Sequence, residues 1–456
     1  MTTPEDTSGA TPTPAPAPAA PPDPGELLRS RPYVMLLVFA AVMGPVVATI
    51  AFAFLQLVDV SQKGVFDHLP NALGFNGEPV WWPLPVVAVA GVVVSLVITY
   101  FPGRGGHSPA DGFSAGGTPP NILPGVILAA LGTLAFGVVL GPEAPLIAIG
   151  SASAALLLLL VRRQAAAPDL QVVGAAGAMA ALSTLIGSPL VAALFMLEAI
   201  GLGGPLLTVV ILPGLVAAGT GALMFVGLGS WTGLGTFTLA IPNLPPAARP
   251  DVAEFAWAIA FGLGAALLAT AVHWGAVWLR GRAEPRMLWT MPVIGLAVGG
   301  LAVIYAESTG RGTSDVLFSG QDLIAPLIQH AATWSVAALV ILVVLKGVAY
   351  SLSLSSFRGG PIFPSLLIGA AAGVAGSHLP GLELVPAVGI GMGAMCCAML
   401  RLPVSSVALP TVLLFHDGVD ITPLVIVAVV VAYVAVSRLA PRPAASLTRP
   451  AVAPAA

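Results

Sequence analysis

The chain of 456 residues is 57% hydrophobic and only 8% charged, and its net charge at pH 7 is −3. Soluble domains carry about 25% charged residues, so this composition excludes an ordinary soluble domain and predicts an all-α polytopic membrane protein. The slightly acidic balance also argues against a nucleic-acid partner, which would require a basic surface.

The two ends of the chain have the composition of disordered tails. Residues 1–28 and 441–456 are rich in proline and alanine and lack the apolar residues that would order them. Arg29 and Arg31 precede the first long apolar run, and this basic pair predicts a cytoplasmic N-terminus.

A first membrane half is predicted over residues 29–229. Its apolar runs, each a predicted helix or helix pair, are residues 33–58, 80–101, 122–140, 146–160, 172–200 and 205–228. Between the second and third runs lies a glycine-rich break that is too irregular for a continuous helix and contains Gly106, His107 and Ser108.

The stretch from Gly141 to Pro145 places one carboxylate, Glu143, between two prolines in apolar sequence. The fifteen residues 146–160 that follow carry no charge. Fifteen helical residues rise only ~22 Å, less than the ~30 Å of the hydrocarbon core, so we expect this helix to begin inside the membrane. A charge at that depth is costly. Glu143 is therefore either part of an anion site or a capping carboxylate at an interfacial turn, and this stretch alone leaves both readings open.

A proline- and glycine-containing linker over residues 230–251 leads to a second membrane half over residues 252–440. Its apolar runs are residues 252–279, 288–305, 331–354, 365–379, 384–400, 404–415 and 421–436. We expect the basic loop of Arg280, Arg282 and Arg286 on the cytoplasmic side. The adjacent Cys396 and Cys397 lie in an apolar run and are interpreted as packing residues; no metal and no cofactor is expected.

A second proline-flanked motif echoes the first. Gly360 to Pro364 repeats the Gly-x-x-x-Pro spacing, and a proline beside an apolar run follows each motif after about forty residues, at Pro189 and Pro403. Interrupted segments at corresponding places in two halves predict an inverted repeat with a site between the breaks. Half-helix N-termini that meet there would present N–H groups to an anion, each helix end contributing roughly 0.3–1 kcal/mol.

In their order and spacing, these motifs resemble those of the CLC family of chloride channels and proton/chloride antiporters, over about residues 29–438. Gly105 to Pro109 stands where the family has Gly-Ser-Gly-Ile-Pro, Gly141 to Pro145 where it has Gly-Lys/Arg-Glu-Gly-Pro, and Gly360 to Pro364 where it has Gly-x-Phe-x-Pro. The resemblance implies an inverted repeat of tilted and broken helices, and a homodimer with a pore in each subunit.

The resemblance also implies transport of chloride or a similar monovalent anion. Glu143 matches the family's gating glutamate, which competes with the anion and carries protons. The implied anion cradle consists of the backbone around Gly106, Ser108, Gly141, Ala144, Ile362 and Phe363.

The chain departs from the family pattern at several motif positions. Gly106 stands where the family often has a chloride-binding serine, and Ile362 stands at the usual phenylalanine position. Pro142 and Pro361 replace residues that could donate a backbone N–H, which proline lacks. We find no clear counterpart of the family's pore tyrosine.

Three further residues are candidates for the pathway: His107, Glu198 and Lys346. Glu198 could be a helix-end carboxylate that faces the cytoplasm, or it could relay protons. Ala199 follows it where proton-coupled members often carry a second glutamate, which favours uncoupled transport. Lys346 could instead snorkel or pair with a carboxylate. His107 beside Ser108, with an aspartate nearby, could suggest an intramembrane hydrolase, although neighbours in one loop rarely assemble as base and nucleophile.

The sequence-based hypothesis is an anion transport protein, gated by Glu143 and without enzymatic activity, that lies among lipids in the plasma (inner) membrane of a bacterium. A structural or receptor-like membrane protein and an intramembrane hydrolase are the alternatives. The choice between channel and proton-coupled exchanger, the preferred anion, the voltage dependence and any regulator stay open at this stage.

Overall fold

The computed structural model describes residues 24–111, 117–201, 205–233, 241–242, 244–245, 250–414 and 418–440. The predicted tails therefore lie outside the described residues at 1–23 and 441–456, and so does most of the predicted linker. Within the described ranges every regular element is a helix, and eight helical stretches are long and apolar enough to cross a membrane. The prediction of an all-α polytopic membrane protein is confirmed.

The helices of the first half follow the apolar runs closely. They are α1 (Pro24–Arg29), α2 (Arg31–Lys63), α3 (Leu69–Ala72), α4 (Pro83–Tyr100), α5 (Leu123–Leu134), α6 (Glu143–Val161), α7 (Ala167–Ile186), α8 (Pro189–Ile200) and α9 (Pro205–Thr232). Helix α1 falls partly within the predicted N-terminal tail. The break between α7 and α8 arises because Gly187 adopts the left-handed conformation and Ser188 caps α8, accepting the Val191 N–H.

The second half supplies the remaining helices. They are α10 (Val252–Ala283), α11 (Met287–Thr309), α12 (Gln321–Gln329), α13 (Val336–Ser356), α14 (Ile362–Gly376), α15 (Leu384–Leu400), α16 (Pro403–Leu413) and α17 (Thr422–Leu439). Asp251 and Glu254 form a reciprocal capping box that fixes the start of α10. Helix α12 was not predicted, because its nine residues are too few and too polar to produce an apolar run.

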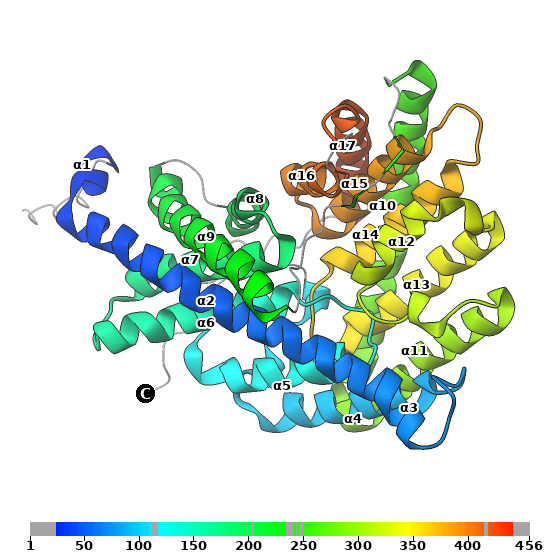
Figure 1. The fold of residues 1–456 in the computed structure, drawn as a ribbon, viewed down its shortest axis with the longest axis horizontal. Helices are drawn as coiled ribbons and strands as arrows, with labels where there is room; N and C mark the ends of the chain where they lie inside the picture. Colours follow the sequence, from blue (N-terminus) through cyan, green and yellow to red (C-terminus); the bar gives the residue numbers. More distant parts are fainter. Residues whose placement is uncertain are drawn as a thin grey trace, which may run out of the picture.

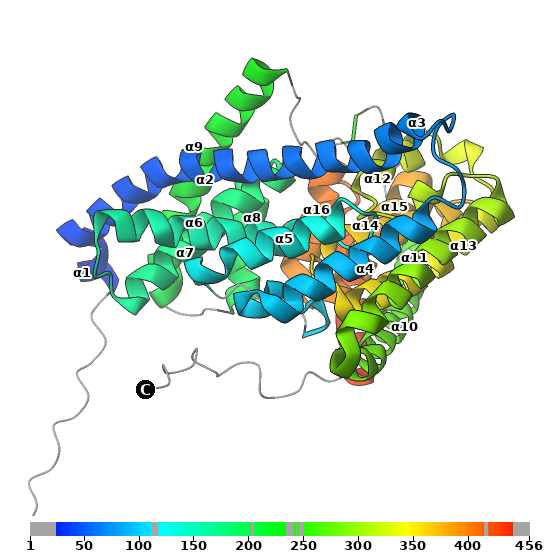
Figure 2. The ribbon, with the colours of Figure 1, turned by 90° about the horizontal axis from the view of Figure 1, so that it is seen from below.

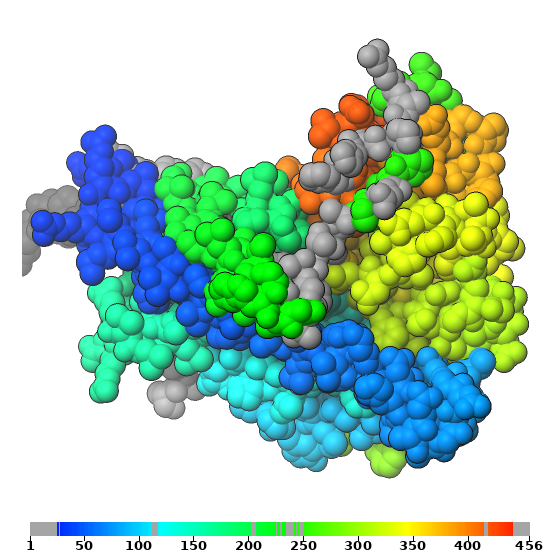
Figure 3. All heavy atoms as spheres, viewed as in Figure 1, coloured from blue at the N-terminus to red at the C-terminus, as the bar shows by residue number. Residues whose placement is uncertain are grey.

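The two halves repeat one packing scheme. Helix α6 packs on α7 as α14 packs on α15, α2 packs on α9 as α10 packs on α17, and α7 meets α8 as α15 meets α16. Helices α4 and α11, which occupy corresponding places, pack against each other, and so do α8 and α16. Figures 1 and 2 show the helices inclined to one another, with blue and cyan first-half elements beside yellow and orange second-half elements. In the space-filling view, the blue and cyan atoms of the first half likewise lie beside the yellow atoms of the second half (Figure 3).

Helix α5 ends at Leu134, six residues before the end of the predicted run. Gly137 adopts a φ of 83°, which ordinary side chains avoid, so the helix cannot continue through it. The residues that follow are buried in irregular backbone, and the Val139 N–H donates to Ser353 Oγ at 3.2 Å. Residues 135–140 are therefore apolar because they are buried in the core, and not because they are helical.

Lys346 of α13 is completely buried, and its ammonium group lies in a cage of backbone carbonyls. Its Nζ atom donates to the carbonyl oxygens of Asp315, Val316 and Leu317 at 3.1, 2.9 and 3.0 Å, with that of Phe318 at 3.4 Å. Since an ammonium has three N–H donors, this cage satisfies it and fixes the loop before α12. These contacts favour a structural role for Lys346 over a place in an ion pathway.

We predict that Lys346→Met lowers the apparent Tm of the purified protein by several degrees. The substitution leaves buried carbonyls without a donor, which costs about 1–3 kcal/mol. Thermal unfolding in detergent, followed by size-exclusion chromatography, measures the change.

The matched control is Lys63→Met, because Lys63 is the only other lysine in the sequence and its side chain is 59% exposed beside Asp59. Exposed ion pairs contribute little, so this variant should unfold like the wild type. An unchanged Tm for Lys346→Met together with a changed ion flux would contradict the structural role.

Candidate functional site

The two Gly-x-x-x-Pro motifs pair with each other at the centre of the molecule. Gly141 and Gly360 form an isolated antiparallel bridge, with N–O distances of 2.7 and 2.6 Å. The next residues, Pro142 and Pro361, are the N-caps of α6 and α14. Proline costs no helical hydrogen bond at this end of a helix, because the first N–H groups lack an acceptor within the helix. The pairing brings two helix N-termini face to face.

Glu143, the first residue of α6, is completely buried at this junction. Its Oε1 accepts the backbone N–H of Phe363, in the first turn of α14, at 2.8 Å. The carboxylate of one half thus caps the helix of the other half, where free N–H groups and the helix dipole favour negative charge. Its oxygens occupy the place that a bound anion would take. Oε2 has no hydrogen-bond partner among the described residues.

Two glycines make room for this carboxylate. A Cβ atom on Gly360 would lie 1.8 Å from Glu143 Oε2, and one on Gly141 would lie 2.2 Å from the same oxygen. Real Cβ atoms do not approach oxygen so closely. The carboxylate can occupy this position, which we call the Glu143 slot, only while both residues are glycine.

One cavity lies beside the slot and a second adjoins the first, since both are lined by Gly103, Gly106, His107 and Arg358. The first cavity, of about 250 Å³, also borders Ala144, at the start of α6. The second cavity, of about 340 Å³, is lined in addition by Ser108, Ser355 and the ionic residues Arg104, Asp111, Arg280 and Glu284.

The predicted cradle residues are therefore distributed over three places. Ile362 and Phe363 are buried at the slot, and the Gly141 N–H is already committed to Gly360. Gly106 borders both cavities; its φ of 95° and ψ of −167° belong to a region that essentially only glycine occupies. A serine at this position would be strained in the same conformation.

Glu198 is placed away from the slot, at the junction of α8 and α16. Its two carboxylate oxygens accept the N–H groups of Val404 and Ser405, both at 2.7 Å, and the Ser405 hydroxyl at 2.6 Å. Glu198, near the end of α8, therefore caps the first turn of α16. The contacts of Asp111 do not favour a hydrolase, since its carboxylate is bound by Arg280.

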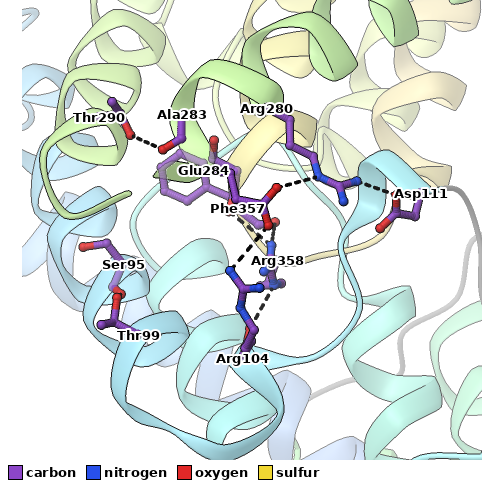
Figure 4. Close-up of polar contacts among 11 residues, drawn as sticks. Ser95, Thr99, Arg104, Asp111, Arg280, Ala283, Glu284, Thr290, Phe357 and Arg358 are labelled. Carbon is purple, nitrogen blue, oxygen red and sulfur yellow. Dashed lines mark hydrogen bonds and ion pairs between the residues drawn. The ribbon is translucent and has the colours of Figure 1, made fainter. Parts of the chain in front are cut away.

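Arg358, which lines both cavities, was not predicted as a site residue. Only 7% of this residue is exposed, and its Nε donates to the carbonyl of Arg104 at 3.3 Å. Its Nη1 donates to the carbonyls of Ser356 and Phe357, both at 3.2 Å. Figure 4 shows the guanidinium between the Arg104 loop and the end of α13. The only signal in the sequence is a single arginine directly before Gly359-Gly360.

The sequence of the chain matches a known protein family. The family model described as "Voltage gated chloride channel" matches residues 110–437. The Escherichia coli O1:K1 protein named "Putative ion-transport protein YfeO" is 29% identical over 379 residues, which cover 81% of this chain and 84% of that protein.

Solved structures share the fold at low identity. A slow cyanobacterial Cl⁻/H⁺ antiporter has a TM-score of 0.70 at 18% identity, covering 90% of this chain and 95% of its own. A CLC-type fluoride/proton antiporter has a TM-score of 0.66 at 18% identity, and the match covers 88% of this chain and 95% of the antiporter chain. Because the family model matches well over half of the sequence, including the motifs from Gly141 to Pro145 and from Gly360 to Pro364, the chain belongs to the voltage-gated chloride channel, or CLC, family.

Proposed function

We propose that this protein carries chloride or a similar monovalent anion across the inner membrane of a bacterium, as a homodimer with a CLC-type pore in each subunit. Glu143 is the gate of that pore. The observation that carries the proposal is the position of the Glu143 carboxylate, which caps α14 through the Phe363 N–H from the opposite half.

The gate works by competition for one electrostatic site. While the carboxylate fills the slot, the N–H groups at the start of α14 already face a negative charge. When the side chain swings out, an anion can take its place on the Phe363 N–H and the neighbouring first-turn groups. Helix ends bind a monovalent anion weakly, and weak sites let an ion leave as readily as it enters.

Protonation of Glu143 offers one way to open the slot. A proton on Oε2, the oxygen without a partner in the described residues, would remove the charge that the helix end holds. Proton transfer through the protein would use a second carboxylate. Ala199 stands where proton-coupled relatives often carry that glutamate, and the neighbouring Glu198 is engaged in capping α16. We therefore expect anion transport that depends on pH through Glu143 without strict exchange for protons.

The test is a flux measurement on the full-length protein in liposomes. Chloride and proton movements are recorded together under a chloride gradient at clamped potential, for the wild type and Glu143→Ala. We expect chloride flux in both proteins, a rise in wild-type flux as the pH falls, and no such rise in Glu143→Ala.

Glu307→Ala is the control, since this carboxylate is exposed near the end of α11 and should leave the flux unchanged. Uphill proton movement that Glu143→Ala abolishes would establish an exchanger instead. Repeating the series with fluoride tests the anion named for one structural neighbour. No anion flux in either protein would contradict the proposal and favour a structural or receptor-like role.

The glycines of the slot give a second, independent prediction. Gly360→Ala introduces a Cβ atom where the Glu143 carboxylate lies, so the carboxylate has to leave the slot. We expect its flux to lose pH dependence as Glu143→Ala does, in the same liposome assay.

The control is Gly264→Ala, because a Cβ atom on Gly264 meets nothing within 4 Å. That variant should keep the wild-type response to pH. If Gly360→Ala folds and keeps that response too, the carboxylate does not gate from this slot.

A further inference from the structure

Five charged side chains gather around the two cavities, and they do not balance. Arg104, Arg280 and Arg358 carry three positive charges, and Asp111 and Glu284 carry two negative charges, which leaves one positive charge (Figure 4). Both carboxylates are engaged: Glu284 lies 3.4 Å from Arg104, and Arg280 contacts Asp111 and Glu284. In the ranges that the structure describes, Arg358 has no ion pair. The excess charge therefore lies on Arg358.

This charge is buried and permanent. Only 7% of Arg358 is exposed, and a guanidinium does not lose its proton in proteins. A buried cation is costly unless negative charge compensates it, and the three carbonyls around Arg358 supply only partial charges. The surroundings favour an anion beside this side chain.

The hydrogen bonds of Arg358 determine which nitrogen is open to a ligand. Nε is committed to the Arg104 carbonyl, and Nη1 to the carbonyls of Ser356 and Phe357. Nη2 donates to none of the described residues. The fork that binds a carboxylate or another oxyanion uses two nitrogens side by side, and here each such pair includes a committed nitrogen. The remaining donor suits a single-atom anion.

We propose that Nη2 of Arg358 is an anion subsite for one halide ion, at the junction of the two cavities. The subsite rests on the proposed anion transport and adds a stage to it. Arg358 stands two residues before Gly360, against which the Glu143 carboxylate lies, and it shares the first cavity with Ala144 and Pro361. A halide held there waits beside the closed gate and enters the slot when Glu143 leaves. Arg280 lines the second cavity together with Arg358, so we expect the halide to reach the subsite from the side of the membrane on which Arg280 lies, which we call the Arg280 side.

The test compares Arg358→Gln and Arg358→Lys with Arg104→Gln in the chloride flux assay, varying chloride on each side in turn. Arg104→Gln is the matched control, because it removes the same charge from the second cavity but from an ion-paired side chain that is 62% exposed. Its backbone carbonyl still holds Arg358. We expect the half-saturating chloride concentration on the Arg280 side to rise roughly tenfold in Arg358→Gln. The rise should be smaller in Arg358→Lys, and less than about threefold in Arg104→Gln.

Bromide provides a readout that does not depend on how the variants fold. Crystals of the wild-type protein grown in sodium bromide should show anomalous density within hydrogen-bonding distance of Arg358 Nη2. Absence of that density, or unchanged half-saturation in a folded Arg358→Gln, would overturn the subsite. Chloride flux with an empty Nη2 position would leave the proposed function standing without it. Bromide at Nη2 in a protein that transports no anion would support the subsite and contradict the proposed function.

Discussion

The structure depends on one electrostatic constraint, the burial of a carboxylate where two helix N-termini meet. In the slot Glu143 is completely buried, so its charge there has to be balanced by the N–H groups and dipole of α14. The antiparallel bridge between Gly141 and Gly360 makes this balance possible, because it holds the N-termini of α6 and α14 next to each other. The two halves therefore depend on each other: the first half supplies the Glu143 carboxylate, and the second half supplies the Phe363 N–H that binds it.

Two prolines and one arginine show how this chain adjusts the family's scheme. Pro142 and Pro361 remove two N–H groups from the centre, which reduces the number of backbone donors that an anion could use. Arg358 places a full positive charge within the same loop as Pro361 and beside the same cavities. In the proposed pathway, Arg358 attracts anions at the approach to the slot, and the N–H groups at the start of α14 attract them within it.

The sequence predicted the elements whose signals are local. Apolar runs located the long helices, and a carboxylate between two prolines singled out Glu143. Helix α12 was missed because nine residues with two glutamines and an aspartate leave no apolar run, and α5 was predicted too long because buried irregular backbone is as apolar as helix.

The site could be predicted only in part, because its contacts join distant segments. Phe363 lies 220 residues from Glu143, and the Arg104 carbonyl lies 254 residues from Arg358. No local pattern tells which N–H a carboxylate will meet across such a separation, or whether a lone arginine will be buried. For Lys346 the same reason applies, since its carbonyl cage comes from a loop about thirty residues earlier.

The central claim is that the Glu143 carboxylate occupies an anion's place, and anomalous diffraction from Glu143→Ala crystals in bromide tests it most directly. We expect a bromide ion in the vacated slot, within hydrogen-bonding distance of the Phe363 N–H and against Gly141 and Gly360. A well-ordered α14 N-terminus with water or nothing in the slot, at bromide concentrations that support transport, would contradict it.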